Sequence, residues 1–375
     1  MKPVALLYCQ HSLGLGHFVR SLVLARELAT KFDLTFINGG PLPTGKPLPP
    51  DVHFEHLPPL RMLDNGQLDG DGEVEAIFAT RLARLLALAA TLRPSLLIVE
   101  LYPFGRKKFA VEIDPLIVAV RGHGGKIACS VRDVLVNDRA DQARHDDRAA
   151  QRLNAQFDLV LVHSDERVFA LGETFRPATA VTIPVRHTGY VVQPAVPAPP
   201  SQRSDTTLVT AGGGAVGHAI YAAAIAAQPL VWARTRWPMT IVAGPLFPEG
   251  DWVDLQARAA AVPGLTLHRS VPDMAALLGN AGRVVGQCGY NSALEIAQAA
   301  IPALYVPFAR NQESEQTMRA MRLTSLGLCE WVAEAGLDSA TLADRLLGLS
   351  SAAHRQCIDV EGAATSARLL TELAA

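Results

Sequence analysis

The chain contains one pattern twice, an apolar strand followed by a glycine-rich turn and a helix, at two places about 200 residues apart. The first copy has its strand at residues 4–9 and its turn at 10–17, and the second has them at 207–211 and 212–218. Strands that alternate with amphipathic helices build parallel sheets, which bind ligands at the carboxyl ends of their strands. The pattern therefore predicts two similar α/β domains, each with a glycine turn at its ligand-binding edge.

The length of the chain agrees with two domains, because 375 residues exceed what one ordinary hydrophobic core organises. The proline-rich segment 192–205 reads as a stiff linker between two periodic regions. We expect an N-terminal Rossmann-like domain at 1–191 and a C-terminal one at 206–357. Within the second domain we expect one helix to end near Ala227 and one strand to run through 265–271.

Composition excludes several classes of protein. The net charge of -2 and a pI near 6.6 give no footprint for nucleic acid. The five cysteines are scattered without a Cys-x-x-Cys pair, which fits a reducing cytoplasm better than a disulfide framework or a zinc site. No apolar run approaches the roughly 18 residues that span a membrane. We expect a cytoplasmic protein without a metal or cofactor, and peripheral contact with the inner face of a membrane stays open.

The segment 283–318 carries the densest set of candidate ligand-binding residues. A short apolar strand leads through a tight turn that ends at Gly289 and then into a helix, whose first turn we expect Asn291 or Ser292 to cap. Backbone N–H groups and the positive end of the helix dipole at Gly289, Tyr290, Asn291 and Ser292 favour a phosphate. Turn and capping needs alone also produce such residues.

Further polar residues in this segment suit the rest of a nucleotide sugar. Glu295 lies one turn inside the helix, where a carboxylate accepts the two hydroxyls of a ribose. A second apolar strand then ends near four side chains that suit sugar hydroxyls: Asn311, Gln312, Glu315 and Gln316.

The catalytic candidates lie in the first half of the chain, at the ends of predicted strands. His17 opens a helix after the first glycine turn and is a candidate general base, and Gly14 and Gly16 permit close approach of a ligand to the backbone. Glu100 and Asp133 end later strands and are alternative bases. Glu100 and Asp133 serve equally well as caps or ion-pair partners, and a histidine at a helix start also caps or packs.

Residues 300–308, with the sequence AIPALYVPF, and the pair Glu315-Gln316 resemble the donor-binding signature of glycosyltransferase family 28. The chain departs from that signature at Ile301, where the family has glycine, and at Glu315, where it has the first of two glutamines. Segments 100–106, 130–133 and 162–165 are similar to a bacterial subgroup of uncharacterised predicted glycosyltransferases.

The resemblance implies the GT-B architecture, two Rossmann-like domains facing across a cleft, with a C-terminal helix at 358–375 that crosses back to the N-terminal domain. It implies a donor, most simply a UDP-sugar, whose diphosphate contacts Gly213 and Gly214 and whose base lies near Val271. The sugar would pass to an unidentified hydroxyl acceptor without a metal. A UDP-sugar 2-epimerase and a non-catalytic nucleotide-sugar-binding protein remain alternatives. A dehydrogenase is weaker, since Asn38 stands where an acidic ribose ligand is expected.

Overall fold

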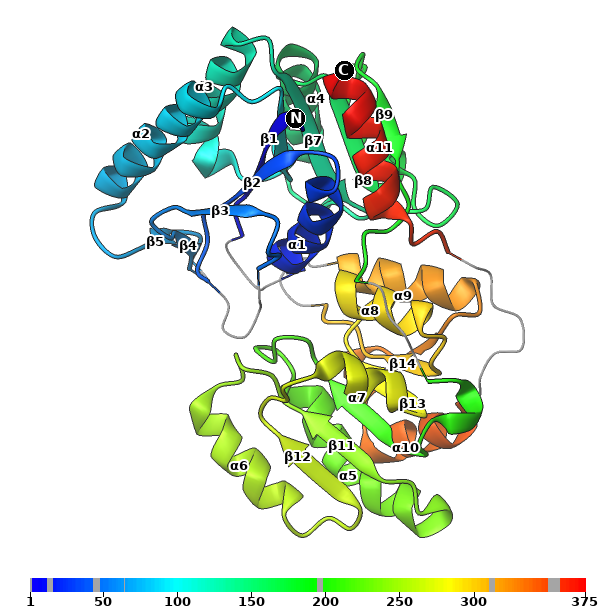
Figure 1. Cartoon of the computed structure of the whole chain (residues 1–375). Coiled ribbons are helices and arrows are strands. Elements are labelled where there is room, and N and C mark those ends of the chain that lie inside the picture. Colours follow the sequence, from blue (N-terminus) through cyan, green and yellow to red (C-terminus); the bar gives the residue numbers. More distant parts are fainter. Residues whose placement is uncertain are drawn as a thin grey trace. The chain divides into compact units, whose positions relative to one another are not determined.

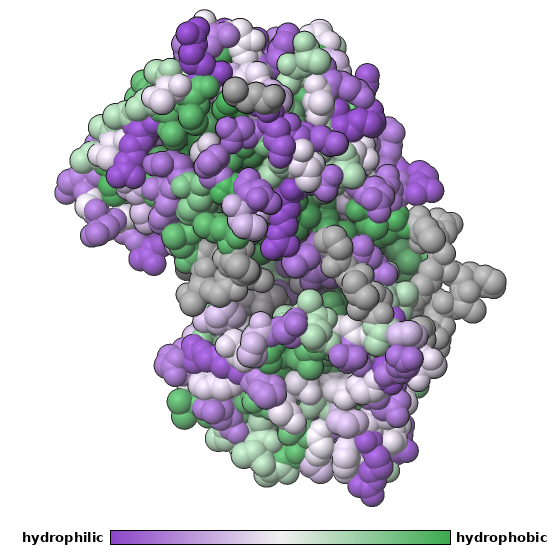
Figure 2. Space-filling view, viewed as in Figure 1, coloured by the Kyte–Doolittle hydropathy of each residue, from purple (hydrophilic) through white to green (hydrophobic). Residues whose placement is uncertain are grey.

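The computed structural model describes residues 2–11, 16–42, 48–63, 65–193, 198–309, 314–349 and 358–375, with the side chain of Pro200 left out. The chain divides into two compact units (Figure 1), residues 1–192 with 358–375 and residues 193–357. No helix in the described part is long and apolar enough to cross a membrane. Figure 2 shows hydrophilic residues spread over the visible face of both units.

The first unit is built on a sheet of seven strands in the order β3-β2-β1-β6-β7-β8-β9, and every neighbouring pair is parallel. Its central strands are buried along their whole length and are apolar up to their last residues, as expected for parallel strands with helices on both faces. The strands are β1 (Val4–Cys9), β2 (Asp33–Asn38), β3 (His53–His56), β6 (Leu96–Glu100), β7 (Lys126–Arg132), β8 (Leu159–His163) and β9 (Val185–His187).

Helices cover both faces of this sheet. One face packs with α2, α3 and α4, and the other packs with α1 and the C-terminal helix α11. The helices are α1 (Gly16–Ala29), α2 (Val74–Leu92), α3 (Ala110–Gly122), α4 (Gln142–Gln156) and α11 (Gly362–Ala374), with 3-10 turns η1 (Lys107–Phe109) and η2 (Leu171–Glu173) and a hairpin of β4 (Arg61–Met62) and β5 (Leu68–Asp69).

The second unit is a parallel sheet of six strands in the order β12-β11-β10-β13-β14-β15. Helices α5, α6 and α10 share one hydrophobic core with its central strands. The strands are β10 (Thr207–Thr210), β11 (Met239–Val242), β12 (Leu265–His268), β13 (Arg283–Gly286), β14 (Ala303–Tyr305) and β15 (Glu330–Trp331). The helices are α5 (His218–Thr235), α6 (Glu249–Ala259), α7 (Met274–Asn280), α8 (Tyr290–Gln298), α9 (Glu315–Ser325) and α10 (Ser339–Gly348), with η3 (Pro200–Gln202) and η4 (Glu334–Gly336).

Both sheets place their first strand in the middle, so the connections run outward in opposite directions from it. This creates a switch point between β1 and β6 in the first unit and between β10 and β13 in the second. Ligands of open α/β sheets bind at the carboxyl ends of the strands beside such a point. The prediction of two Rossmann-like α/β domains is confirmed.

Two predicted element boundaries are wrong. Strand β12 ends at His268 rather than at Val271, because its partner β11 ends at Val242, directly opposite His268. Helix α5 continues past Ala227 to Thr235 and contains Pro229. The buried side chains of Gln228 and Val231 continue its packed face, so core packing outweighs the helix-breaking tendency of the proline.

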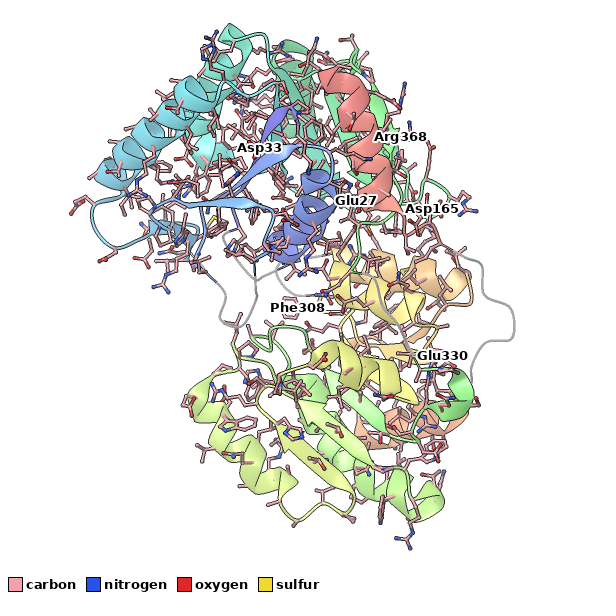
Figure 3. All side chains as sticks on the ribbon, in the orientation of Figure 1. Glu27, Asp33, Asp165, Phe308, Glu330 and Arg368 are labelled. Carbon is pink, nitrogen blue, oxygen red and sulfur yellow. The ribbon has the colours of Figure 1, made fainter. Side chains whose placement is uncertain are left out.

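The C-terminal segment is fastened to the first unit through its backbone. The amide of Tyr190 donates to the carbonyl of Asp359 at 2.7 Å, and the amide of Asp359 donates to Asp165 Oδ2 at 2.9 Å. Figure 3 labels Asp165 beside the start of α11. Gly362 begins α11 so close to this joint that an added Cβ would lie 2.3 Å from the carbonyl oxygen of Gly189.

We predict that Gly362→Ala lowers the free energy of unfolding by about 1–3 kcal/mol, because neither backbone can yield freely to the methyl group. Gly122→Ala is the matched control, since Gly122 ends α3 in the same unit and an added Cβ there meets no atom within 4 Å. Urea denaturation followed by circular dichroism measures both variants. Equal stabilities of the two variants would contradict the close contact.

Candidate functional site

In the first unit, polar side chains converge at the switch point between β1 and β6. His17 is the second residue of α1, which follows the turn after β1, and Glu100 is the last residue of β6. The two strands are paired, with Tyr8 opposite Val99, so the ends of both strands meet at one edge of the sheet. The fold therefore brings together two residues that are 83 positions apart in the sequence.

His17 and Glu100 form a buried pair. His17 Nδ1 lies 2.6 Å from Glu100 Oε1, and the side chains are 13% and 1% exposed. Arg20, one turn along α1, donates to the same carboxylate oxygen, and Arg106 Nη2 lies 4.0 Å from Glu100 Oε2. Two guanidinium groups and an imidazole therefore surround one carboxylate.

This arrangement fixes the charge state of both groups. Burial raises the pKa of the Glu100 carboxyl, but His17, Arg20 and Arg106 outweigh burial and hold that pKa at about 2. Burial lowers the pKa of His17 to about 4 against the opposing influence of Glu100. At neutral pH the pair is thus a carboxylate and a neutral imidazole.

The tautomer of His17 follows from these charges. A carboxylate only accepts hydrogen bonds, so the proton of the imidazole lies on Nδ1 and is donated to Glu100. Nε2 then carries a lone pair and can take a proton. The pair has the chemistry of a general base whose ring is oriented by a carboxylate.

The remaining candidates of this unit are Asp133 and two glycines of the first turn. Asp133 follows β7, is buried, and accepts a hydrogen bond from the amide of Val134 at 2.8 Å, which fixes the turn after that strand. Gly16 is the exposed first residue of α1, and Gly14 lies outside the described residues.

The second unit joins its two glycine turns at the switch point between β10 and β13. Gly214 has a φ of +94°, and an added Cβ would lie 2.0 Å from the carbonyl oxygen of Ala243. Only glycine fits this approach between the turn and the end of β11. Gln287 in the turn after β13 donates to the carbonyl of Val216 at 3.2 Å and so connects the two turns.

Tyr221 stabilises the first of these turns through its hydroxyl, a role that the sequence did not predict. Its hydroxyl accepts from the amide of Ala211 at 3.1 Å and donates to the carbonyl of Ala243 at 2.7 Å. The carbonyl oxygen of Gly213 accepts a hydrogen bond from the amide of Leu246 at 2.8 Å. The amide of Gly213 itself donates to no group in the described part of the chain. The turn is therefore rigid and presents an amide donor at the ligand-binding edge.

The start of α8 differs in detail from the prediction. The capping residue is Gly289, which makes no side-chain cap, and the helix begins at Tyr290. Asn291 and Ser292 lie inside the first turn, so the prediction that one of them caps the helix is wrong. Because an added Cβ at Gly289 would meet nothing within 4 Å, the backbone here is open to a ligand.

Arg319 connects the start of α8 to the start of α9, a role that the sequence interpretation missed. Its buried guanidinium donates to the carbonyl of Cys288 at 2.7 Å and to Glu315 Oε1 at 2.7 Å. Gln316, which follows Glu315 in α9, accepts a hydrogen bond on Oε1 from the amide of Phe308 at 3.1 Å (Phe308 is labelled in Figure 3). The spacing of Glu315 and Arg319, one helical turn, was the available sequence signal.

The structure thus gathers most of the predicted donor-binding residues at one edge of the second sheet. Glu295 lies partly exposed on α8, and Val271 lies partly exposed in the segment after β12. Asn311 and Gln312 lie outside the described residues.

The chain contains one Asp-x-Asp spacing, Asp69-Gly70-Asp71, at the β4–β5 hairpin. Asp69 Oδ2 accepts from Arg61 Nε at 2.6 Å. Among the residues that the structure describes, no three His, Cys, Asp or Glu side chains are grouped so that they could hold a metal ion.

Comparison with known proteins agrees with this geometry. Residues 260–369 match the glycosyltransferase family 28 C-terminal domain. The solved calicheamicin glycosyltransferase CalG4 has the same fold, with a TM-score of 0.61 at 16% identity over 100% of this chain and 95% of its own. MurG of Acinetobacter baumannii superposes with a TM-score of 0.58 at 14% identity over 99% of each chain. The two units therefore form a GT-B fold.

Two curated relatives carry the same printed name, UDP-N-acetylglucosamine--N-acetylmuramyl-(pentapeptide) pyrophosphoryl-undecaprenol N-acetylglucosamine transferase. The protein of Lactiplantibacillus plantarum is 33% identical over 38% of this chain and 40% of its own length. That of Ralstonia nicotianae is 36% identical over 26% of this chain and 28% of its own length. The matches thus span less than half of either relative. The chain therefore has the GT-B fold, and its residues 260–369 are similar to the glycosyltransferase family 28 C-terminal domain.

A buried histidine beside the pair predicts acid sensitivity of the first unit. His163 lies between Ser130 Oγ at 2.7 Å and Thr188 Oγ1 at 3.0 Å, and burial, helped by Arg20, lowers its pKa to about 3. The unfolded chain binds this proton below its ordinary pKa of about 6.5. The free energy of unfolding should therefore fall as the pH drops from about 6.5 toward 3, by up to ~1.4 kcal/mol per pH unit.

His163→Asn should remove this contribution and flatten the dependence on pH. Urea denaturation at several pH values, followed by circular dichroism, compares the slopes of the two proteins rather than their absolute stabilities. Parallel curves for the wild type and the variant would show that His163 is protonated alike in the folded and unfolded chains.

Proposed function

We propose that this protein is a glycosyltransferase that moves a sugar from a nucleotide diphosphate donor, a UDP-sugar, to a hydroxyl group of an acceptor. The observation that carries the proposal is the buried pair of His17 and Glu100 at a switch point, where a carboxylate oxygen lies 2.6 Å from Nδ1 of the imidazole. The family 28 domain and the relatives named for transfer from UDP-N-acetylglucosamine support the choice of donor.

In the proposed reaction His17 Nε2 takes the proton of the acceptor hydroxyl while that oxygen bonds to the anomeric carbon of the sugar. The bond from this carbon to the diphosphate oxygen breaks, and the diphosphate leaves with the electron pair. Glu100, already hydrogen-bonded to Nδ1, stabilises the imidazolium that forms. Arg20 and Arg106 keep Glu100 ionised, so they position the base without touching the substrate.

The second unit would bind the donor. The amide of Gly213 and the first turn of α8 would stabilise the negative charge on the diphosphate, which is the work that a metal performs in other transferases. Glu295 would bind the ribose hydroxyls. The side-chain oxygen of Gln316 accepts from the amide of Phe308, so the side-chain NH₂ group of Gln316 would donate to the sugar. We assign Glu315 to holding Arg319 rather than to sugar contact.

The alternatives differ in what they consume. A UDP-sugar 2-epimerase converts its substrate without an acceptor, and a binding protein releases no UDP. Calorimetric titration with UDP, GDP, dTDP and NAD, followed by measurement of UDP release with water and with a panel of hydroxyl acceptors, separates the three. Release of UDP that depends on an acceptor identifies the transferase.

Glu100→Gln should lower kcat by about 10²–10⁴ while donor affinity stays unchanged, because the amide no longer fixes the Nδ1–H tautomer or stabilises the imidazolium. His17→Ala should lose a similar factor. The assay is UDP release with the acceptor that the screen identifies. Circular dichroism shows whether each variant is folded, and calorimetry with UDP measures donor affinity.

His53→Ala is the matched control for these two variants. His53 pairs with Asp33 at 2.9 Å, but both side chains are more than half exposed and lie at the amino ends of β3 and β2, the edge of the sheet opposite to the site. This variant should keep the wild-type kcat. Wild-type turnover in both His17→Ala and Glu100→Gln would transfer the base to another residue.

Glu295→Ala should weaken UDP binding about tenfold or more, because two charge-assisted hydrogen bonds to the ribose are lost. Asp254→Ala removes a carboxylate from the exposed helix α6 of the same unit and should leave the affinity unchanged. Calorimetry with UDP measures both. Equal affinities for the two variants would remove the ribose role from Glu295.

A further inference from the structure

We propose that the first unit binds a phosphate group in a pocket separate from the His17–Glu100 pair. This α4 pocket has a volume of about 220 Å³ and is lined by the side chains of Tyr102, Lys107, His145, Arg148 and Arg152. All of them belong to the first unit, so the pocket exists independently of the second. The inference does not depend on the proposed transfer reaction.

The sequence forms this pocket from two segments on the same face of the sheet. His145, Arg148 and Arg152 are spaced by three and four residues on α4, so they lie along one side of that helix. Tyr102 and Lys107 come from the segment between β6 and α3, which packs in the same core as α4. Cationic groups therefore approach the pocket from two elements.

The nearby carboxylates leave part of this positive charge unmatched. Asp114 pairs with Arg152 at 3.1 Å and accepts the hydroxyl of Tyr102. Asp146 accepts from Gln142 Nε2 at 2.7 Å and from the amide of Arg176 at 2.9 Å. Asp141 acts on Lys107 only at longer range.

Lys107 and Arg148 keep no such partner. Both are exposed and form no hydrogen bond or ion pair with any residue that the structure describes. The pKa of Lys107 is lowered first by partial burial and then by Arg139, Arg148 and Arg152, against the influence of Asp141. A bound anion would relieve this repulsion.

His145 adds a second, independent observation. Its side chain is 5% exposed and lines the pocket, and it forms only a long ion pair with Asp146, with Nδ1 3.6 Å from Asp146 Oδ1 and no closer hydrogen bond among the described residues. The protein thus satisfies this imidazole only weakly, and an oxyanion bound beside the ring would interact favourably with it. The pocket therefore offers a buried polar group as well as surface charge.

The ligand that fits these donors is a phosphate monoester or inorganic phosphate. A tetrahedral oxyanion has three oxygens that can accept from an ammonium, a guanidinium and an imidazole placed on different sides. A pocket of about 220 Å³ leaves room for a small group attached to the phosphate. Two sources present this chemistry, a soluble phosphate ester and a phosphomonoester lipid headgroup.

The test is calorimetric titration of the full chain with inorganic phosphate and with glycerol 3-phosphate at low salt, and flotation with phosphatidylcholine vesicles that contain phosphatidic acid. We expect saturable binding that weakens about tenfold in Lys107→Gln and in Arg148→Gln and disappears in the double variant. Both side chains are exposed, so the variants should fold, and circular dichroism confirms this.

Arg144→Gln is the matched control, because Arg144 is an exposed arginine of the same helix that does not line the pocket. It should bind phosphate like the wild type. Binding of the soluble ester alone, lost in the double variant, supports the proposal with a soluble ligand, and vesicle binding lost in the same way supports it with a lipid. Absence of saturable phosphate binding, or equal loss in Arg144→Gln, would overturn it.

Discussion

The carboxylate of Glu100 is the group on which the chemistry of the first unit depends. A charge that is 1% exposed persists only where partners replace its hydration, and here Arg20 and His17 bind Oε1 while Arg106 lies 4.0 Å from Oε2. Because Glu100 ends β6 while His17 and Arg20 begin α1, the charge also fixes the start of α1 against the end of β6. One buried carboxylate therefore sets the tautomer of His17 and the geometry of the switch point together.

The second unit meets a different electrostatic need by different means. Its switch point contains close backbone approaches at Gly214 and Gly244, and its one buried guanidinium among the described residues at this edge, Arg319, binds a backbone carbonyl and Glu315. The positive charge of Arg319 is thus paired within the protein. Amide dipoles are left to face a ligand, and such fixed dipoles stabilise a departing diphosphate without having to reorganise.

The fold could be predicted because its signals are local. A strand such as Leu96–Glu100, buried on both faces, and a glycine turn before a helix identify parallel α/β units without long-range information. The pairing of His17 with Glu100 could not be predicted, since strand order decides which of the strand-end residues Glu100 and Asp133 meets α1. Arg319 and Tyr221 were missed for a related reason: a charged or polar residue on a helix signals solvent unless the turn it supports is known.

The contrast between the two units bears on how a base and a leaving-group site can coexist in one protein. A base needs a neutral imidazole. Burial lowers the pKa of His17 to about 4, and Glu100 raises this pKa against burial and against the nearby Arg106 and Arg132. A site for a diphosphate needs positive potential. Unpaired cations beside His17 would supply it, but they would lower the pKa of His17 further and so make it a weaker base. In the function that we propose, Arg20 and Arg106 would act on Glu100 in one unit, and the amides of Gly213 and the start of α8 would bind the diphosphate in the other, so that separate groups meet the two requirements.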